Sequence, residues 1–180
     1  CMVSRMIKAK VPDAYTVFIG PCIAKKSEVK DQQIEGNADA VLTFSEIRAI
    51  MKAKGVVLTA EENSYQEASV FGKRYGNSGG VTNAVLEYLK ETDNEIDAKV
   101  YRANGAADCK KALLLMKVGR LPEDFIEGMA CEGGCVGGPS AFQGEIASKK
   151  NRDSLISCAD CRTIVENLSK IDMGAFEHHR

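Results

Sequence analysis

The sequence has no tryptophan, few aromatic residues and almost no net charge. Only 6% of its 180 residues are aromatic, and 24 Lys and Arg face 25 Asp and Glu, for a formal net charge of -1. Such a balance gives no overall attraction to nucleic acid or to an anionic membrane. We find no apolar run long enough to cross a bilayer, and the first residues do not resemble a signal peptide. These absences favour an ordinary globular protein located in the cytoplasm.

Cysteine, in contrast, is abundant. The seven cysteines are Cys1, Cys22, Cys109, Cys131, Cys135, Cys158 and Cys161. An odd number at uneven spacing does not suit the disulfide framework of a small secreted protein. Four of them form two close pairs, Cys131 with Cys135 and Cys158 with Cys161. Clustered cysteines in such a chain favour metal binding or redox chemistry.

Short β-branched and aromatic runs alternate with stretches of helical periodicity. Strands are predicted at residues 15–19, 39–42, 99–102 and 125–130, the first of them as a buried strand. A capping box at Thr43 and Glu46 predicts the start of one helix, and Asp108 is predicted to cap another. This alternation is typical of an α/β fold with a mostly parallel sheet flanked by helices.

The most specific motif runs from Met129 to Pro139. Four glycines surround Cys131 and Cys135 there, so the backbone can wrap closely around a bulky group and offer amides to inorganic sulfide. Thiolates in such a loop suit an iron–sulfur cluster better than a single zinc ion, although thiolate ligands alone do not separate the two.

A second motif, from Gly20 to Glu28, places Cys22 after a proline and next to two lysines. A nearby ammonium group favours the thiolate and can donate to an anionic ligand. Taken alone, this motif also fits a turn with solvated lysines. Cys22 and Cys131 each follow a predicted strand, and ligands of parallel sheets gather at that end, so we expect both to face one crevice.

Together the two motifs resemble those of the iron-only ([FeFe]) hydrogenase family, in the C-terminal portion of the catalytic domain of its large subunit. The family motif Pro-Cys-x-x-Lys-x-x-Glu is matched by Pro21, Cys22, Lys25 and Glu28. The motif Glu-x-Met-Ala-Cys-x-Gly-Gly-Cys-x-x-Gly-Gly is matched by Glu127, Met129, Ala130, Cys131, Gly133, Gly134, Cys135 and Gly138. The resemblance extends over residues 2–144, and it implies about half of a hydrogenase active-site domain.

The resemblance implies an H-cluster in the full-length parent protein, which is a 4Fe-4S cluster joined to a two-iron subsite. It implies that Cys22, Cys131 and Cys135 are cluster ligands, with Cys135 bridging the two parts. It also implies that Lys25 donates a hydrogen bond to the two-iron subsite and that Met129 packs against it. The implied activity of the parent is reversible H2 oxidation and proton reduction, or H2 sensing, in an anaerobic setting.

Two family features are missing from these residues. The motif Thr-Ser-Cys-Cys-Pro, which supplies the fourth cubane ligand, is absent, and so is the glutamine that follows the glycines in catalytic members. In lacking this glutamine, the sequence resembles the sensory or regulatory branch of the family. We therefore expect a fragment that is inactive alone and binds no complete cofactor. Its expected partners are the missing N-terminal half of the same protein, and either an electron carrier such as ferredoxin or a signalling domain. Whether the chain is itself an enzyme stays open.

The Cys158–Cys161 pair lies outside the resemblance. Residues 145–180 are expected to form a polar, helical extension to a domain of residues 1–144. The pair could ligate an accessory cluster, form a redox couple or be idle. With Cys131 and Cys135 it could also complete a four-thiolate zinc site in a structural domain, which is the alternative function. Cys109 is expected to be a small core residue.

Overall fold

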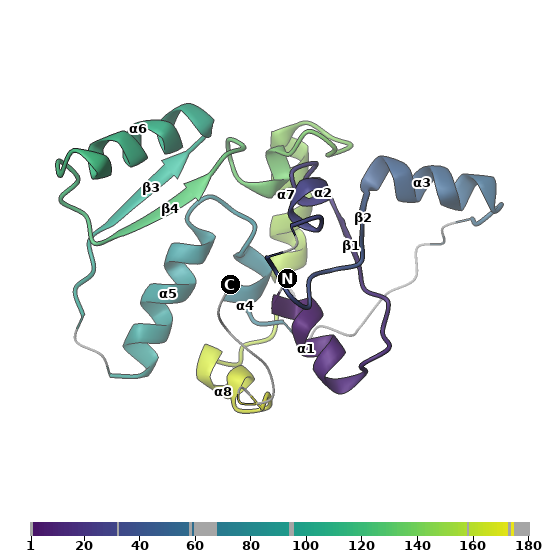
Figure 1. Cartoon of the computed structure of the whole chain (residues 1–180), viewed down its shortest axis with the longest axis horizontal. Coiled ribbons are helices and arrows are strands. Elements are labelled where there is room, and N and C mark those ends of the chain that lie inside the picture. The colour runs from purple at the N-terminus through teal and green to yellow at the C-terminus, as the bar shows by residue number, and fades with distance from the viewer. Residues whose placement is uncertain are drawn as a thin grey trace. The chain divides into compact units, whose positions relative to one another are not determined.

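The computed structural model describes residues 2–31, 33–57, 59, 68–93, 96–157, 159–172 and 174. The chain divides into two compact units, which are described separately. The first unit comprises Cys1–Glu61, Pro139–Phe142 and Ile171–Arg180, and the second comprises Glu62–Gly138 and Gln143–Lys170. Each contains a pair of parallel strands with helices beside it, which confirms the predicted α/β class (Figure 1). The boundary expected at residue 144 stays a prediction. None of the described helices is both long enough and apolar enough to cross a membrane.

The first unit is built on two parallel strands. Its elements are α1 (Met2–Lys10), β1 (Val17–Gly20), α2 (Lys25–Glu28), β2 (Ala40–Thr43) and α3 (Phe44–Ala53). The predicted capping box is confirmed where β2 passes into α3. The Thr43 hydroxyl accepts a hydrogen bond from the Glu46 N–H, and the Glu46 carboxylate accepts one from the Thr43 N–H at 2.8 Å. This reciprocal pair satisfies two N–H groups that have no partner within the helix.

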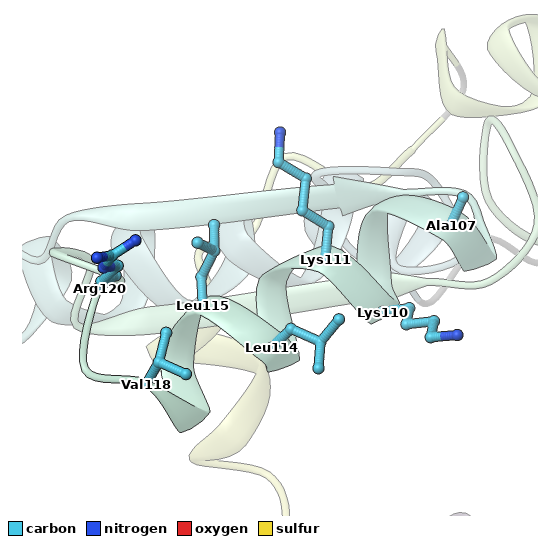
Figure 2. Close-up of a pocket in the computed structure, with 7 residues that line it drawn as sticks. All are labelled: Ala107, Lys110, Lys111, Leu114, Leu115, Val118 and Arg120. Carbon is cyan, nitrogen blue, oxygen red and sulfur yellow. The ribbon is translucent and has the colours of Figure 1, made fainter.

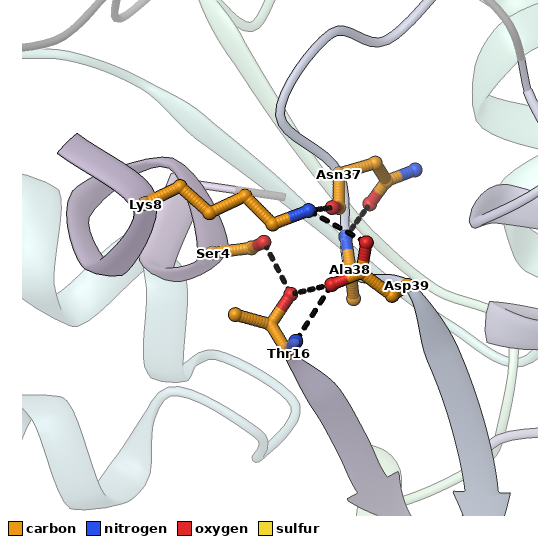
Figure 3. Close-up of polar contacts among 6 residues, drawn as sticks. All are labelled: Ser4, Lys8, Thr16, Asn37, Ala38 and Asp39. Carbon is orange, nitrogen blue, oxygen red and sulfur yellow. Dashed lines mark hydrogen bonds and ion pairs between the residues drawn. The ribbon is translucent and has the colours of Figure 1, made fainter. Parts of the chain in front are cut away.

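A polar network joins α1 to the beginning of the sheet (Figure 3). The Asp39 carboxylate accepts hydrogen bonds from the Thr16 N–H at 2.6 Å and from the Thr16 hydroxyl at 2.9 Å. The Lys8 ammonium pairs with the same carboxylate at 2.8 Å. Because Thr16 has a single hydroxyl proton, the buried Ser4 hydroxyl is the donor in their 2.8 Å contact. The network fixes α1 against the residue that precedes β1.

Strand β1 is not buried, which corrects the expectation for residues 15–19. Val17 is 42% exposed and Ile19 is 48% exposed, and only Gly20 of the strand is buried. Among the described residues β1 pairs with β2 alone, so it is an edge strand. A run of apolar residues predicts a strand but not the number of layers that cover it, and a two-stranded sheet covers little.

The second unit has the same βαβ arrangement with more helices. Its elements are α4 (Val70–Arg74), α5 (Gly80–Glu91), β3 (Val100–Asn104), α6 (Ala106–Lys117), β4 (Phe125–Met129), the 3₁₀ turn η1 (Cys135–Gly137), α7 (Glu145–Ser157) and α8 (Ile164–Leu168). Strands β3 and β4 are parallel and in register, so that Asn104 lies opposite Met129 at their carboxyl ends. Helices α5 and α6 lie on opposite sides of this pair (Figure 1).

Helix α6 begins earlier than predicted. Its N-cap is Gly105, and Asp108 lies in the first turn instead of at the cap. The Asp108 carboxylate accepts hydrogen bonds from the Asn104 N–H at 3.0 Å and from the Tyr101 hydroxyl at 2.9 Å. These donors hold the pKa of Asp108 below its usual value, the Asn104 N–H contributing most. Asp108 therefore joins β3 to α6. A sequence rule for helix caps does not distinguish an acid in the first turn from an acid at the N-cap.

Candidate functional site

The loop after β4 carries the first predicted pair of thiols. Cys131 is half-buried and Cys135 is exposed. Between them the chain makes a tight turn closed by the Gly134 N–H, which donates to the Cys131 carbonyl at 3.0 Å. Gly133 and Gly134 have φ values of 76° and 89°. Side chains other than glycine rarely adopt such values, so the two central glycines are required by the course of the backbone.

The same loop lies against the residues that precede α5. The Cys135 N–H donates to the Gly76 carbonyl at 2.7 Å, and Asn77 forms a bridge with Gly134. A Cβ atom at Gly134 would lie 2.3 Å from the Gly76 oxygen, and one at Gly76 would lie 3.6 Å from the Cys135 sulfur. The two backbones therefore approach at Gly134 more closely than a larger residue allows, whereas a Cβ at Gly76 would make only an ordinary contact. The hydrogen bond to Gly76 fixes the position of Cys135.

Two asparagines border the loop. The Asn104 side chain, at the carboxyl end of β3, accepts a hydrogen bond from the Gly133 N–H at 2.8 Å. The side-chain oxygen of Asn77 is buried and has no hydrogen-bond partner among the described residues. Neither residue was predicted for the site. The signal for Asn104 was its place at a strand end before a glycine, but its partner in the loop is far away in the sequence.

Glu127 anchors β4 behind the loop. It is only 4% exposed, and its carboxylate accepts from the Gly79 N–H at 2.9 Å and from the Thr82 N–H at 3.2 Å. The Thr82 hydroxyl, which is fully buried, is a third donor. A buried carboxylate is costly unless donors surround it, and here two backbone amides and one hydroxyl do so. Glu127 thereby holds β4 against the start of α5 and positions the loop that follows.

The second motif lies in the first unit. Cys22 is half-buried and follows β1, as predicted. Lys25 begins the short helix α2 and forms an ion pair with Glu28. The Pro21 carbonyl accepts a hydrogen bond from the Ser140 N–H at 3.2 Å, within the same unit. Strands β1 and β4 belong to different sheets, and a joint site for Cys22, Lys25 and the Cys131 loop stays a prediction.

The remaining predicted residues are more dispersed. Met129, half-buried, ends β4, and its carbonyl accepts from the Gly105 N–H at 2.7 Å. Cys161 is exposed, and Cys158 lies outside the described residues. The Cys109 sulfur is half-buried and would lie 3.5 Å from a Cβ at Gly128. Within either unit, the part of the chain that the structure describes holds no group of three or more His, Cys, Asp or Glu placed to bind a metal ion.

Comparison with known proteins agrees with the motifs. Residues 1–139 match the family described as iron only hydrogenase large subunit, C-terminal domain. This match covers well over half of the chain, so the protein belongs to that family. Neither the comparisons nor the geometry of the described residues supports the alternative zinc-binding domain.

Two curated relatives are similar over most of the chain. The periplasmic [Fe] hydrogenase large subunit of Nitratidesulfovibrio vulgaris is 31% identical over 170 residues, which cover 75% of this chain and 40% of the relative. Iron hydrogenase 1 of Clostridium pasteurianum is 32% identical over 164 residues, covering 70% of this chain and 28% of the relative. The chain thus spans less than half the length of these relatives.

Solved structures share the fold. An [FeFe]-hydrogenase structure concerned with stepwise H-cluster assembly superposes with a TM-score of 0.66 at 20% identity, covering 94% of this chain and 62% of that one. An [FeFe]-hydrogenase of Chlamydomonas reinhardtii gives a TM-score of 0.60 at 20% identity, with coverage of 94% and 61%. At this identity the likeness establishes the architecture, and the chemistry rests on the chain's own residues.

Proposed function

We propose that this chain forms part of an [FeFe]-hydrogenase active-site domain whose parent protein interconverts H2 with protons and electrons, or senses H2. The observation that carries the proposal is the cysteine loop after β4. It presents one exposed and one half-buried thiol on a backbone that glycine geometry fixes against Gly76. The parent would act with an electron carrier such as ferredoxin or with a signalling domain.

An H-cluster fits the donor chemistry of this chain. Thiolates are the usual ligands of iron–sulfur clusters, and Cys22, Cys131 and Cys135 would supply three of them. The Asn77 side-chain oxygen is buried without a hydrogen-bond partner among the described residues, and the backbone of Asn77 pairs with that of the loop residue Gly134. A half-turn of the Asn77 amide would exchange the positions of its oxygen and its NH2 group, and the NH2 group could then donate to an anionic sulfide. When bound, the group supplies electron transfer and the site of H2 cleavage.

The residues of the second motif would orient the bound group and neutralise part of its negative charge. Lys25 lies three residues after Cys22 and forms an ion pair with Glu28, so its ammonium is restricted before any ligand arrives. Met129 would contribute an apolar contact at the end of β4.

The fourth thiolate would come from a part of the longer protein that these 180 residues do not contain. The low coverage of the curated relatives supports this proposal. The chain by itself is then expected to show no H2 evolution or uptake. A cytoplasmic location and an anaerobic setting stay predictions, and one relative is named as periplasmic.

Anaerobic reconstitution of the chain with ferrous iron and sulfide tests the proposal. Iron and labile sulfide are measured together with absorption and EPR spectra, for the unaltered chain and for Cys131→Ser and Cys135→Ser. We expect both substitutions to reduce iron uptake. The control substitution Cys109→Ser, which removes a thiol outside the site, should leave iron uptake unchanged. Binding of zinc without iron, or equal iron content in all variants, would contradict the proposal.

A further inference from the structure

Helix α6 packs one face on its sheet, and large apolar side chains on its other face are exposed. Ala112 is fully buried, and Cys109 lies against Gly128 of β4. On the outer face Leu114 is 55% exposed and Val118 is 63% exposed. Apolar side chains at such exposure leave more than half of their surface in water. An apolar strip rimmed by polar residues is a feature of interaction sites.

The exposed strip borders an open groove with a volume of about 380 Å³ (Figure 2). Its apolar lining residues are Ala107, Leu114, Leu115 and Val118. Leu114 lies seven residues after Ala107 and four before Val118, so the three side chains follow one another along one side of the helix. A strip of this spacing is the kind of surface on which a second helix packs.

The charges that border the groove have one sign. Lys110, Lys111 and Arg120 are all the charged residues among the described lining residues, and each is a cation. The acid of the helix, Asp108, is occupied by Tyr101 and by the Asn104 N–H. The chain as a whole carries a formal net charge of only -1, so this concentration of positive charge is local.

The end of α6 places the third cation. Gly119, with φ of 66°, lets the chain reverse, and its N–H donates to the Met116 carbonyl at 3.1 Å. The Arg120 N–H then donates to the Leu115 carbonyl at 2.9 Å. This pair of bonds is a Schellman motif, which closes a helix in a defined geometry. These backbone hydrogen bonds therefore fix the position of Arg120 at the border of the groove.

We propose that the outer face of α6 docks an amphipathic helix with acidic flanks, contributed by a separate protein. Leucine-like side chains of that helix would pack on Leu114 and Val118, and its carboxylates would meet Lys110, Lys111 and Arg120. A separate protein is favoured over a permanent intramolecular cover because permanent interfaces are more apolar and resemble a protein core, whereas three cations border this groove. The central apolar strip likewise favours a protein over nucleic acid, whose backbone needs only the cations.

The test is fluorescence anisotropy of the full chain with a labelled helical peptide of about three heptads. The probe has leucine at the a and d positions and glutamate at the flanking positions, and a control peptide has lysine in place of glutamate. We expect the acidic peptide to bind and the basic one not to. Affinity should fall when NaCl is raised from about 20 to about 150 mM, because the charge pairs lie at the protein surface.

Two variants and two matched controls locate the site. Leu114→Gln and the double change Lys110→Glu with Lys111→Glu should each weaken binding by about tenfold or more. Ile146→Gln replaces an equally apolar residue, 87% exposed on α7, and Lys90→Glu reverses a charge on α5, so neither should alter binding. Circular dichroism checks that all four variants fold.

Several outcomes would overturn the proposal. These are equal binding of both peptides, unchanged binding by Leu114→Gln, and stronger binding to duplex DNA or to vesicles containing phosphatidylserine than to the acidic peptide. Dimerisation of the chain that is abolished by Leu114→Gln would also overturn it, because the face would then bind a second copy.

Discussion

Glu127 accepts hydrogen bonds from both the backbone N–H and the hydroxyl of Thr82, although the two residues come from different elements and both are buried. The pair joins β4 to the first turn of α5. Since Gly79, which also donates to Glu127, precedes that helix, the carboxylate accepts from three donors at one helix start. The cysteine loop begins two residues after β4, so its support depends on this carboxylate.

Replacing Glu127 by Gln should destabilise the second unit. The amide would turn an NH2 group toward donors and leave at least one buried N–H or hydroxyl unsatisfied, at a cost of about 2 kcal/mol. Urea unfolding of the two proteins measures the difference. Glu87→Gln, in the partly exposed ion pair with Lys90, is the control and should stay within about 0.5 kcal/mol of the unaltered chain. Equal stability of Glu127→Gln would show that the carboxylate is not needed.

Gly134→Ala tests the close approach of the two backbones beneath Cys135. Gly134 has φ of 89° and ψ of -158°, a region that is nearly restricted to glycine, and an added Cβ would meet the Gly76 oxygen. We expect a loss of about 3 kcal/mol or more from strain and displacement together. Gly55→Ala provides the comparison, because Gly55 has φ of 67° and nothing within 4 Å. It should cost only about 1 kcal/mol, measured by the same denaturation.

The same variant has a functional readout. Displacing the loop moves Cys135, so reconstituted iron content should fall in Gly134→Ala and not in Gly55→Ala. Full iron uptake by Gly134→Ala would mean that the contact with Gly76 serves folding alone.

Local signals in the sequence were sufficient where the cause of a structure is local. The capping box at Thr43 and Glu46 was predicted because its two residues satisfy each other. The cysteine loop was predicted because glycine enrichment reports directly on backbone conformation. Burial of β1 was not predictable in this way, since exposure depends on how many strands and helices cover the run.

Helix α7 was expected only as part of a helical, polar extension. Most of its side chains are polar, and of its isoleucines Ile146 is 87% exposed while Ile156 is 6% exposed. A helix that buries so little lacks the clear apolar period on which sequence reasoning relies. The supports of the site were also missed, because Asn104 and Gly76 act through partners far along the chain. No spacing rule reports such contacts.

The stability of the chain should fall in acid because donors hold the Asp39 carboxylate ionised in the folded state. The Lys8 ammonium first, and the Thr16 N–H next, lower the pKa of Asp39 from 3.8 to about 2. Because the folded state binds this proton more weakly than the unfolded chain, the stabilisation is complete above about pH 4 and is lost as pH falls toward 2. Asp39→Asn should therefore be less stable at pH 7, and its difference from the unaltered chain should shrink between pH 4 and 2. Asp13→Asn, at an exposed residue, should track the unaltered chain at every pH in the same thermal unfolding series.

Asn104→Ala should loosen the cysteine loop with little effect on the rest of the second unit. The change removes the acceptor for the Gly133 N–H, and a lost hydrogen bond of this kind costs about 1 kcal/mol. Hydrogen exchange should then show faster exchange of the Gly133 and Gly134 amides, while amides of β3 keep their protection. Asn104→Asp retains an acceptor oxygen and should restore slow exchange. If β3 loses protection in Asn104→Ala to the same extent as the loop, the side chain supports the strand pair as a whole and has no specific role in holding Cys131 and Cys135.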